Sequence, residues 1–345
     1  MTSPRTVLII GTQSNGSLES SYGRAFEAIG WQVAWWNPDL ARHAMVRGGR
    51  LGQLFSTFVD VDPWLRKANL QLLQQVAVLQ PDLLLVIATD GVRAGTLAHV
   101  RSLSPRTVLY CVFPDSLHQF KAERLLSLPL FDRFTVASSE WIAPAEQLGA
   151  PQVVHLPFAA DPVLHRPLAP TSQMPHWEVG FIGTWRHERE ELLERLAGFE
   201  LTVWGNRYWR TRVRRGSPLP KRWSGRAAQG SEFAQVCANT AIMLNIVEPM
   251  TWPGPNMRTF ELAACGAFTL STRTPAVLEL FQEHQTVVCF DTIEEAQEQI
   301  RYYVAHPGER QRIAAAAYAL VTRQGHTYVD RARQLVAWWE QDRRG

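Results

Sequence analysis

Short apolar runs that each end at a small or polar residue constrain this fold more than any other feature. Such runs are typical of strands in a parallel sheet, because helices cover both faces of its central strands. In the first half of the chain they occupy residues 7–10, 32–36, 83–87, 107–113, 134–137 and 153–156. Helix-like segments separate them, beginning with 22–29, so the order of elements predicts a doubly wound α/β domain.

The same pattern starts again after residues 157–177, which contain five prolines and no periodicity and are the best linker candidate. Further apolar runs follow at 179–182, 201–204, 241–246, 268–271 and 286–290. A chain of 345 residues is too long for one comfortable core and fits two domains. We therefore predict two Rossmann-like domains, 1–160 and 161–325, and a C-terminal helix, 326–345, that crosses back to the first. Ligands of such sheets bind at the carboxyl ends of the strands, so a cleft between the domains is the expected site.

Composition narrows the class of protein. Hydrophobic residues make up 46% and charged residues 19%, which is typical of a globular chain, and a net charge of +3 argues against a nucleic-acid binder. The N-terminal apolar run is too short for a secretory signal and no run would span a bilayer, so we expect a cytoplasmic protein. The scattered cysteines predict reduced core thiols, with neither disulfides nor a metal site. They are Cys111, Cys237, Cys265 and Cys289.

The most informative segment is 256–274, which predicts a loop, a short helix, a glycine and a buried strand. Arg258 and Glu261 are three residues apart, so they share one helix face near its N-terminus. Backbone N–H groups and the positive end of the helix dipole favour a phosphate there, and a guanidinium suits phosphate oxygens. A carboxylate at Glu261 is suited to the two hydroxyls of a ribose. The alternative is a helix with one solvent-exposed ion pair.

Several segments together carry a family resemblance. They are 156–168, 179–196, 256–268, 300–317 and 326–328. Residues 80–340 resemble the CgeB-like glycosyltransferases, which are named for a spore-maturation protein and belong with the group-1, family-4-like enzymes of the GT-B fold. The resemblance is dense in the C-terminal half.

This resemblance implies a hexosyltransferase-like enzyme that moves a sugar from a nucleotide-diphosphate sugar to a hydroxyl. The donor nucleotide would be UDP, GDP or dTDP, and the acceptor a glycan, a lipid-linked molecule, a protein or a small molecule. By the same resemblance the C-terminal domain holds the donor, and Glu261 binds its ribose. Many relatives carry a second acidic residue before this helix, where the present chain has Pro253.

Other donor-site candidates follow strand ends or start the helix of Arg258. They are Gly183, Thr184, Arg186, Trp204, Gly205, Asn256 and Thr259. The alternative for Gly183-Thr184 is an ordinary strand-to-helix turn, and Trp204 is alternatively a core residue.

The acceptor is expected in the N-terminal domain, where Gly11, Thr12 and Gln13 form a loop after the first strand. An inverting transferase needs a general base near the acceptor hydroxyl, and a retaining enzyme needs none. The candidates for this base are Asp115, Asp90 and His118, which follow strand ends. Asp115 is alternatively a helix cap or turn residue.

Residues 207–226 contain eight Lys or Arg and no acidic residue, together with Tyr208, Trp209 and Trp223. A solvated loop is the usual explanation of a charge run. The aromatic residues also suggest contact with an anionic acceptor or, peripherally, with an anionic membrane. Nucleic acid is a weaker candidate.

Missing motifs exclude other chemistries. No DxD motif stands at a strand end, so we expect no catalytic metal and no cofactor besides the donor. The chain lacks a phosphate-binding GxxxxGK[ST] loop and a GxGxxG after the first strand, which disfavours an NTPase and a dehydrogenase. Two alternatives to a transferase stay open: a GT-B-like sugar-nucleotide epimerase or hydrolase that needs no acceptor, and a glycan-binding scaffold without turnover.

Overall fold

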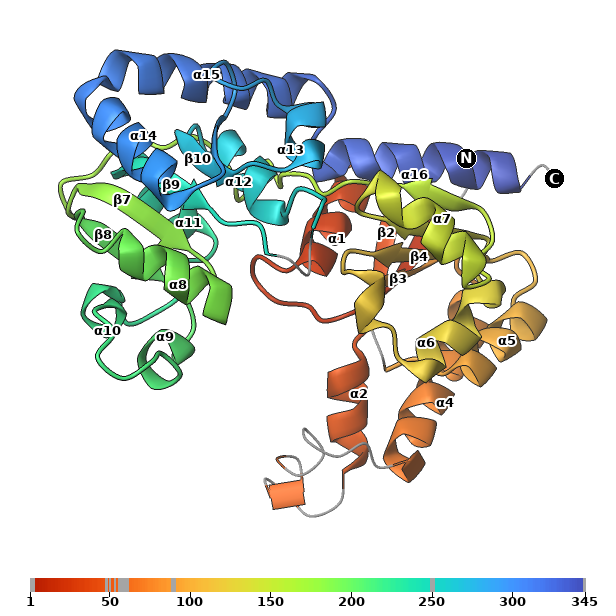
Figure 1. Ribbon diagram of the computed structural model, residues 1–345. Helices are drawn as coiled ribbons and strands as arrows, with labels where there is room; N and C mark the ends of the chain where they lie inside the picture. Colours follow the sequence, from red (N-terminus) through yellow and green to blue (C-terminus); the bar gives the residue numbers. More distant parts are fainter. Residues whose placement is uncertain are drawn as a thin grey trace. The chain divides into compact units, whose positions relative to one another are not determined.

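A computed structural model of the chain describes residues 4–46, 49, 51, 52, 54, 62–87, 91–248 and 252–343. The chain divides into two compact units. Met1–Pro157 and Val329–Gly345 form the N-terminal unit, and Phe158–Tyr328 form the C-terminal unit. Each unit is a parallel sheet with helices (Figure 1), which confirms the predicted fold class of two Rossmann-like α/β domains.

The sheet of the N-terminal unit has the order β2-β1-β3-β4-β5-β6, and all neighbouring pairs are parallel. Its strands are β1 (Thr6–Ile10), β2 (Gln32–Trp36), β3 (Leu83–Ile87), β4 (Val108–Phe113), β5 (Arg133–Val136) and β6 (Val153–His155). Each lies within two residues of a predicted run. Strands β3 and β4 are buried throughout, as their unbroken apolar sequences require.

Helices connect these strands and supply their own end signals. They are α1 (Leu18–Ala28), α2 (Pro38–Met45), α4 (Asp62–Leu79), α5 (Ala94–Leu103), α6 (Ala122–Ser127) and α7 (Ile142–Gln147), with the 3-10 turns η1 (Leu117–Gln119), η2 (Leu128–Leu130) and η3 (Ser139–Trp141). Ser17 caps α1 by accepting the Ser20 N–H, and Asn37 caps α2, where Pro38 takes the first helical position.

The last helix, α16 (Tyr328–Asp342), packs on the N-terminal unit although it follows the C-terminal unit in the sequence. The Trp339 indole donates to the carbonyl of Asp82 at 3.0 Å. The Asp342 carboxylate accepts from Arg133 at 2.7 and 2.8 Å and from the Tyr110 hydroxyl. These groups tie the end of the chain to β4 and β5.

The sheet of the C-terminal unit has the order β11-β10-β9-β7-β8, again with parallel neighbours. Its strands are β7 (Trp177–Ile182), β8 (Leu201–Trp204), β9 (Thr240–Asn245), β10 (Thr269–Thr272) and β11 (Val288–Phe290). The helices are α8 (His187–Arg195), α9 (Tyr208–Thr211), α10 (Leu219–Arg222), α11 (Ser231–Ala238), α12 (Met257–Ala264), α13 (Pro275–Leu280), α14 (Ile293–Ala305) and α15 (Pro307–Arg323).

The two faces of this second sheet carry separate cores. Val179 and Phe181 of β7 pack in a cluster with residues of α8 and α14. Ile182, the last residue of β7, packs in another cluster with residues of α11 and α12. Because side chains alternate along a strand, α8 and α12 cover opposite faces of the sheet.

Candidate functional site

The strand order of the C-terminal unit reverses at β7. From β7 the chain moves to β8 at one edge, and then returns to β9 on the other side of β7. The helices that follow β7 and β9, namely α8 and α12, lie on opposite faces, so their N-terminal ends diverge at this point. Open parallel sheets bind ligands in the crevice outside the carboxyl ends of the strands at such a switch point.

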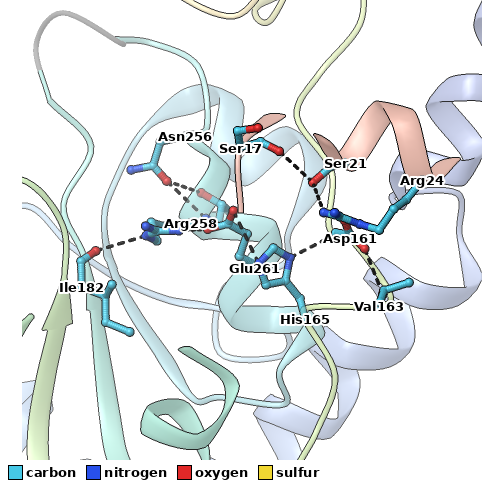
Figure 2. A network of polar contacts seen from close by, with 11 residues as sticks. Ser17, Ser21, Arg24, Asp161, Val163, His165, Ile182, Asn256, Arg258 and Glu261 are labelled. Atoms are coloured by element: carbon cyan, nitrogen blue, oxygen red, sulfur yellow. Dashed lines mark hydrogen bonds and ion pairs between the residues drawn. The ribbon is translucent and has the colours of Figure 1, made fainter. Parts of the chain in front are cut away.

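Arg258 and Glu261 stand at this switch point, on the first turns of α12 (Figure 2). The Arg258 Nε donates to the carbonyl of Ile182, the last residue of β7, at 3.1 Å. Its Nη1 pairs with the Glu261 carboxylate, and its guanidinium lies 4.8 Å from the centre of the Phe233 ring. Arg258 therefore bridges β7 and α12 across the switch point.

The Glu261 carboxylate is inside the protein, with 2% of the side chain exposed, whereas 32% of Arg258 is exposed. His165 Nδ1 accepts the N–H of Asp161 at 3.1 Å, so a neutral His165 ring carries its proton on Nε2 (Figure 2). That nitrogen faces Glu261 Oε1 at 3.7 Å. The Arg258–Glu261 pair is thus largely buried. The alternative interpretation of the sequence was a solvent-exposed ion pair.

Burial is the main cause that lowers the pKa of Arg258 to about 10; the nearby Arg189 acts in the same direction, and Cys237 and Cys265 act against it. A pKa of about 10 leaves the guanidinium positively charged at neutral pH. The switch point therefore presents a partly desolvated cation, and desolvation strengthens its attraction for an anion.

A second ionic cluster joins the loops that follow β7 and β9. The Arg189 Nη1 lies 2.7 Å from Glu248 Oε1, and the Arg186 Nε lies 3.5 Å from Glu248 Oε2. Arg189 also donates to the carbonyl of Thr184 at 2.9 Å and to its hydroxyl at 3.2 Å. Desolvation lowers the pKa of Arg189, although Glu248 raises it.

Arg189 was missed from the sequence, where Arg186 was singled out instead. The signal that points to it is helical spacing, since the two arginines are three residues apart and share a face at the start of α8. In the structure Arg189 is the more buried of the two, with 12% of its side chain exposed against 56% for Arg186.

Two of the other predicted donor-site residues, Asn256 and Thr259, support the local backbone. Asn256 caps α12 by accepting the Thr259 N–H at 3.2 Å. The buried Thr259 hydroxyl accepts from Asn245 at 3.1 Å, and Asn245 also donates to Ser271 at 3.0 Å. Asn245, which the sequence did not single out, thus links the ends of β9 and β10 to α12.

The glycines and Trp204 at the ends of β7 and β8 are closely packed. Trp204 is buried against Trp177 at 4.8 Å between ring centres, so its side chain belongs to the core. A Cβ on Gly205 would lie 2.5 Å from the Trp209 Nε1 and closer still to the carbonyl of Gly183. The latter carbonyl accepts the Trp209 indole N–H at 2.8 Å. Gly205 is therefore required for close approach of the two loops.

Comparison with known proteins gives a family match for part of the chain. Residues 186–337 match the model of a family described as glycosyl transferase-like, and this segment contains Arg189, Glu248, Arg258 and Glu261. No curated protein matches the chain.

Among solved structures, the chain is similar to sucrose-phosphate synthase from Thermosynechococcus elongatus, with 15% identity, 98% of each chain covered and a TM-score of 0.67. It is also similar to a glycosyltransferase from Rickettsia africae, with 10% identity, 98% of each chain covered and a TM-score of 0.66. A third is Anabaena HepE in complex with UDP-glucose, with 12% identity, 97% of this chain and 99% of that chain covered, and a TM-score of 0.63. The chain has the GT-B fold.

In the N-terminal unit of this GT-B protein, the predicted acceptor loop follows β1. Gly11 N donates to the carbonyl of Trp36 at 3.2 Å, and a Cβ there would meet the Glu19 side chain. The Thr12 hydroxyl contacts Asp39 at 3.5 Å, and Gln13 is exposed. These contacts define the path of the loop, while its role with an acceptor stays a prediction.

The predicted catalytic bases Asp115 and His118 both follow β4. Ser116 caps η1 by accepting the His118 N–H, so Asp115 is not the cap of this turn. His118 packs edge-on against Trp141 at 5.4 Å between ring centres. Asp90 lies outside the described residues.

All four cysteines are free and buried, which agrees with core thiols. Within the described ranges of the chain, no group of three His, Cys, Asp or Glu residues has the arrangement of a metal site. None of the helices in the described part is long and apolar enough to cross a membrane.

Proposed function

We propose that this protein is a glycosyltransferase that moves a sugar from a nucleoside-diphosphate sugar to a hydroxyl group. The observation that carries the proposal is the gathering of Arg186, Arg189 and Arg258 at the switch point of the C-terminal sheet. Arginines with fork geometry at the N-terminal ends of two helices suit a diphosphate. The match of residues 186–337 to a glycosyl transferase-like family supports it.

A diphosphate leaves the sugar readily when its developing negative charge is stabilised. In the structure Glu248 balances Arg186 and Arg189, and Glu261 balances Arg258. When a donor binds, its phosphates would take over contacts that Glu248 now makes with the two arginines of α8. Three guanidinium groups then stabilise the leaving diphosphate, and we propose that no metal ion is needed.

We propose a UDP-sugar as the donor, in preference to a GDP- or dTDP-sugar. The support is the similarity to Anabaena HepE, whose structures contain UDP, UDP-glucose, or UDP and glucose. The uracil would lie near the ends of β7 and β8, where the side chain of Asn206 accepts the Trp185 N–H at 3.4 Å.

The roles of Arg258 and Glu261 follow from their exposure. Arg258 is accessible enough to touch the diphosphate directly, and Glu261 holds it in place from the buried side. The ribose contact predicted for Glu261 requires the Arg258–Glu261 pair to open when the donor binds. Either role makes the carboxylate necessary for donor binding.

The acceptor hydroxyl is assigned to the N-terminal unit. The loop of Gly11, Thr12 and Gln13 follows β1, and the loop of Asp115 and His118 follows β4. Strands β1 and β4 are the two neighbours of β3 in the sheet. For an inverting reaction we propose Asp115, Asp90 or His118 as the base that takes the proton of the acceptor hydroxyl.

The proposal is tested by titrating UDP and UDP-glucose into the wild type, Glu261→Gln and Glu261→Ala in a calorimeter. Loss of a charge-assisted hydrogen bond to Arg258 should weaken UDP binding at least tenfold, about 1.4 kcal/mol. Glu279→Gln, on the exposed side of α13, is the matched control and should bind as the wild type does.

Unchanged UDP binding in both Glu261 variants, with wild-type stability, would overturn the donor-site assignment. Turnover of UDP-glucose that does not depend on any added acceptor would point instead to a hydrolase or an epimerase. Binding of a glycan without release of nucleotide would point to a scaffold.

A further inference from the structure

The segment 207–226 between β8 and α11 forms a folded, strongly basic surface. It carries α9 and α10, contains eight Lys or Arg and no acidic residue, and exposes seven of the eight cations. The exposed ones are Arg207, Arg210, Arg212, Arg214, Arg215, Lys221 and Arg226. We call them the basic surface.

Two tryptophans hold this segment against the carboxyl edge of the sheet. The Trp209 side chain is fully buried, and its indole donates to the carbonyl of Gly183 at 2.8 Å. The Trp223 indole donates to the carbonyl of Gly205 at 3.0 Å. Since Gly183 and Gly205 follow β7 and β8, the basic surface is built on the edge of the sheet that carries the arginine cluster of the switch point.

Much of the positive charge on this surface is not balanced by acidic side chains among the described residues. Arg214 pairs with Glu194, and Arg226 pairs with Glu232. Arg212 lies over the Tyr208 ring at 4.0 Å. Within the described part of the chain, Arg207, Arg210, Arg215 and Lys221 make no ion pair with an acidic side chain. A surface of this kind attracts anions.

The apolar side chains of the segment argue against a membrane as its partner. A helix that lies in a membrane interface exposes Trp, Phe or Leu next to its cations. Here Trp209 and Leu219 are buried, and no large hydrophobic residue among the described part of 207–226 is strongly exposed. Of the aromatic residues that suggested membrane contact in the sequence, Trp209 is buried, and Tyr208 and Trp223 are half-buried.

The same burial disfavours a single-stranded nucleic acid. Proteins that bind such strands stack successive bases on exposed aromatic faces. Trp209 is buried, Trp223 is engaged with Gly205, and Arg212 covers one face of Tyr208. The surface offers charge without a stacking platform.

We propose that the basic surface binds an anionic glycan, which bears carboxylate or phosphate groups and is the acceptor of this enzyme. The assignment as acceptor rests on the proposed function, whereas binding of the glycan does not. Seven of the eight cations in the segment are arginines, whose fork geometry matches carboxylate and phosphate oxygens. The basic surface also lies at the same carboxyl edge of the C-terminal sheet as the arginine cluster proposed to hold the donor.

The test compares an oligogalacturonate with a neutral dextran oligomer of the same length, by calorimetry at 0.15 M salt. The variant Arg207→Gln, Arg210→Gln, Lys221→Gln should bind the oligogalacturonate about tenfold more weakly than the wild type. The matched control is Arg166→Gln, Arg301→Gln, Arg323→Gln, which removes three exposed cations elsewhere in the same unit and should change the affinity less than twofold. Wild-type affinity for the dextran oligomer should be at least tenfold lower than for the oligogalacturonate.

UDP binding by the same proteins separates this inference from the proposed function. If the wild type binds UDP but does not distinguish the two oligomers, the inference fails and the proposed function stands. Another outcome is that the wild type binds the oligogalacturonate but not UDP, and that the triple variant of the basic surface binds the oligogalacturonate more weakly. In that case the donor assignment fails and the anionic-glycan site stands. Equal losses in both variants, or tighter binding to phosphatidylglycerol vesicles or to oligouridylate, would overturn the inference.

Discussion

Substitution of Gly205 by alanine tests the close approach of the loops after β7 and β8. The added Cβ would lie 2.5 Å from the Trp209 Nε1 and closer still to the Gly183 carbonyl. Carbon and oxygen atoms that are not bonded stay about 3.3 Å apart or more even in their closest favourable contacts. The two loops must therefore separate, and the hydrogen bond from Trp209 to Gly183 must break or lengthen.

The expected loss of stability combines three contributions. Overpacking costs about 1–3 kcal/mol, and the lost hydrogen bond costs about 1 kcal/mol. The lower conformational entropy of the unfolded chain with alanine returns about 0.4–1 kcal/mol. The net destabilisation is about 1–3.5 kcal/mol, which corresponds to a fall in Tm of about 2–14 °C for a unit of this size.

Differential scanning calorimetry of the full chain measures this change, with Gly198→Ala as the matched control. Gly198 lies in the same unit, and nothing lies within 4 Å of a Cβ built on it. The control should melt at the wild-type temperature or slightly above. A Gly205→Ala protein that melts within 1 °C of both would refute the argument that this glycine is needed for close packing.

Three further predictions concern other parts of the molecule. Burial raises the pKa of Asp342, but hydrogen bonds from Arg133 and Tyr110 outweigh this and hold it below its usual value. This group therefore contributes stability that is complete above the unfolded pKa of about 3.9 and is lost as the pH falls through the folded pKa. In urea unfolding, Asp342→Asn should lower the free energy of unfolding by about 2 kcal/mol at pH 7 and by progressively less below about pH 3.9. A difference from the wild type that is constant at all pH values would contradict this role of the Asp342 carboxylate. Arg189→Lys keeps the charge but loses the fork geometry, so UDP should bind about tenfold more weakly by calorimetry, while Arg195→Lys at the exposed end of α8 should not matter. Transfer from UDP-glucose should keep its rate in EDTA; a loss that Mn²⁺ restores would show that the arginines alone do not neutralise the diphosphate.

The sequence alone predicted the sheet architecture, because the signal for a buried parallel strand is local. Leu83–Ile87 and Val108–Phe113 are apolar at every position, and each is buried at every position in the structure. The Arg258–Glu261 pair was also predictable, since a spacing of three residues on a helix brings two side chains together wherever the helix lies.

Only the tertiary structure decided the features that depend on residues far apart in the chain. Arg189 meets Glu248 because β7 and β9 are neighbours in the sheet, and no local pattern reports that adjacency. For the same reason, the sequence did not show that Glu261 is buried or that Trp209 and Trp223 point inward. Composition and spacing show which chemical groups a segment contains. The order of the strands in the sheet determines which of these groups are buried, which are paired and which are left for a ligand.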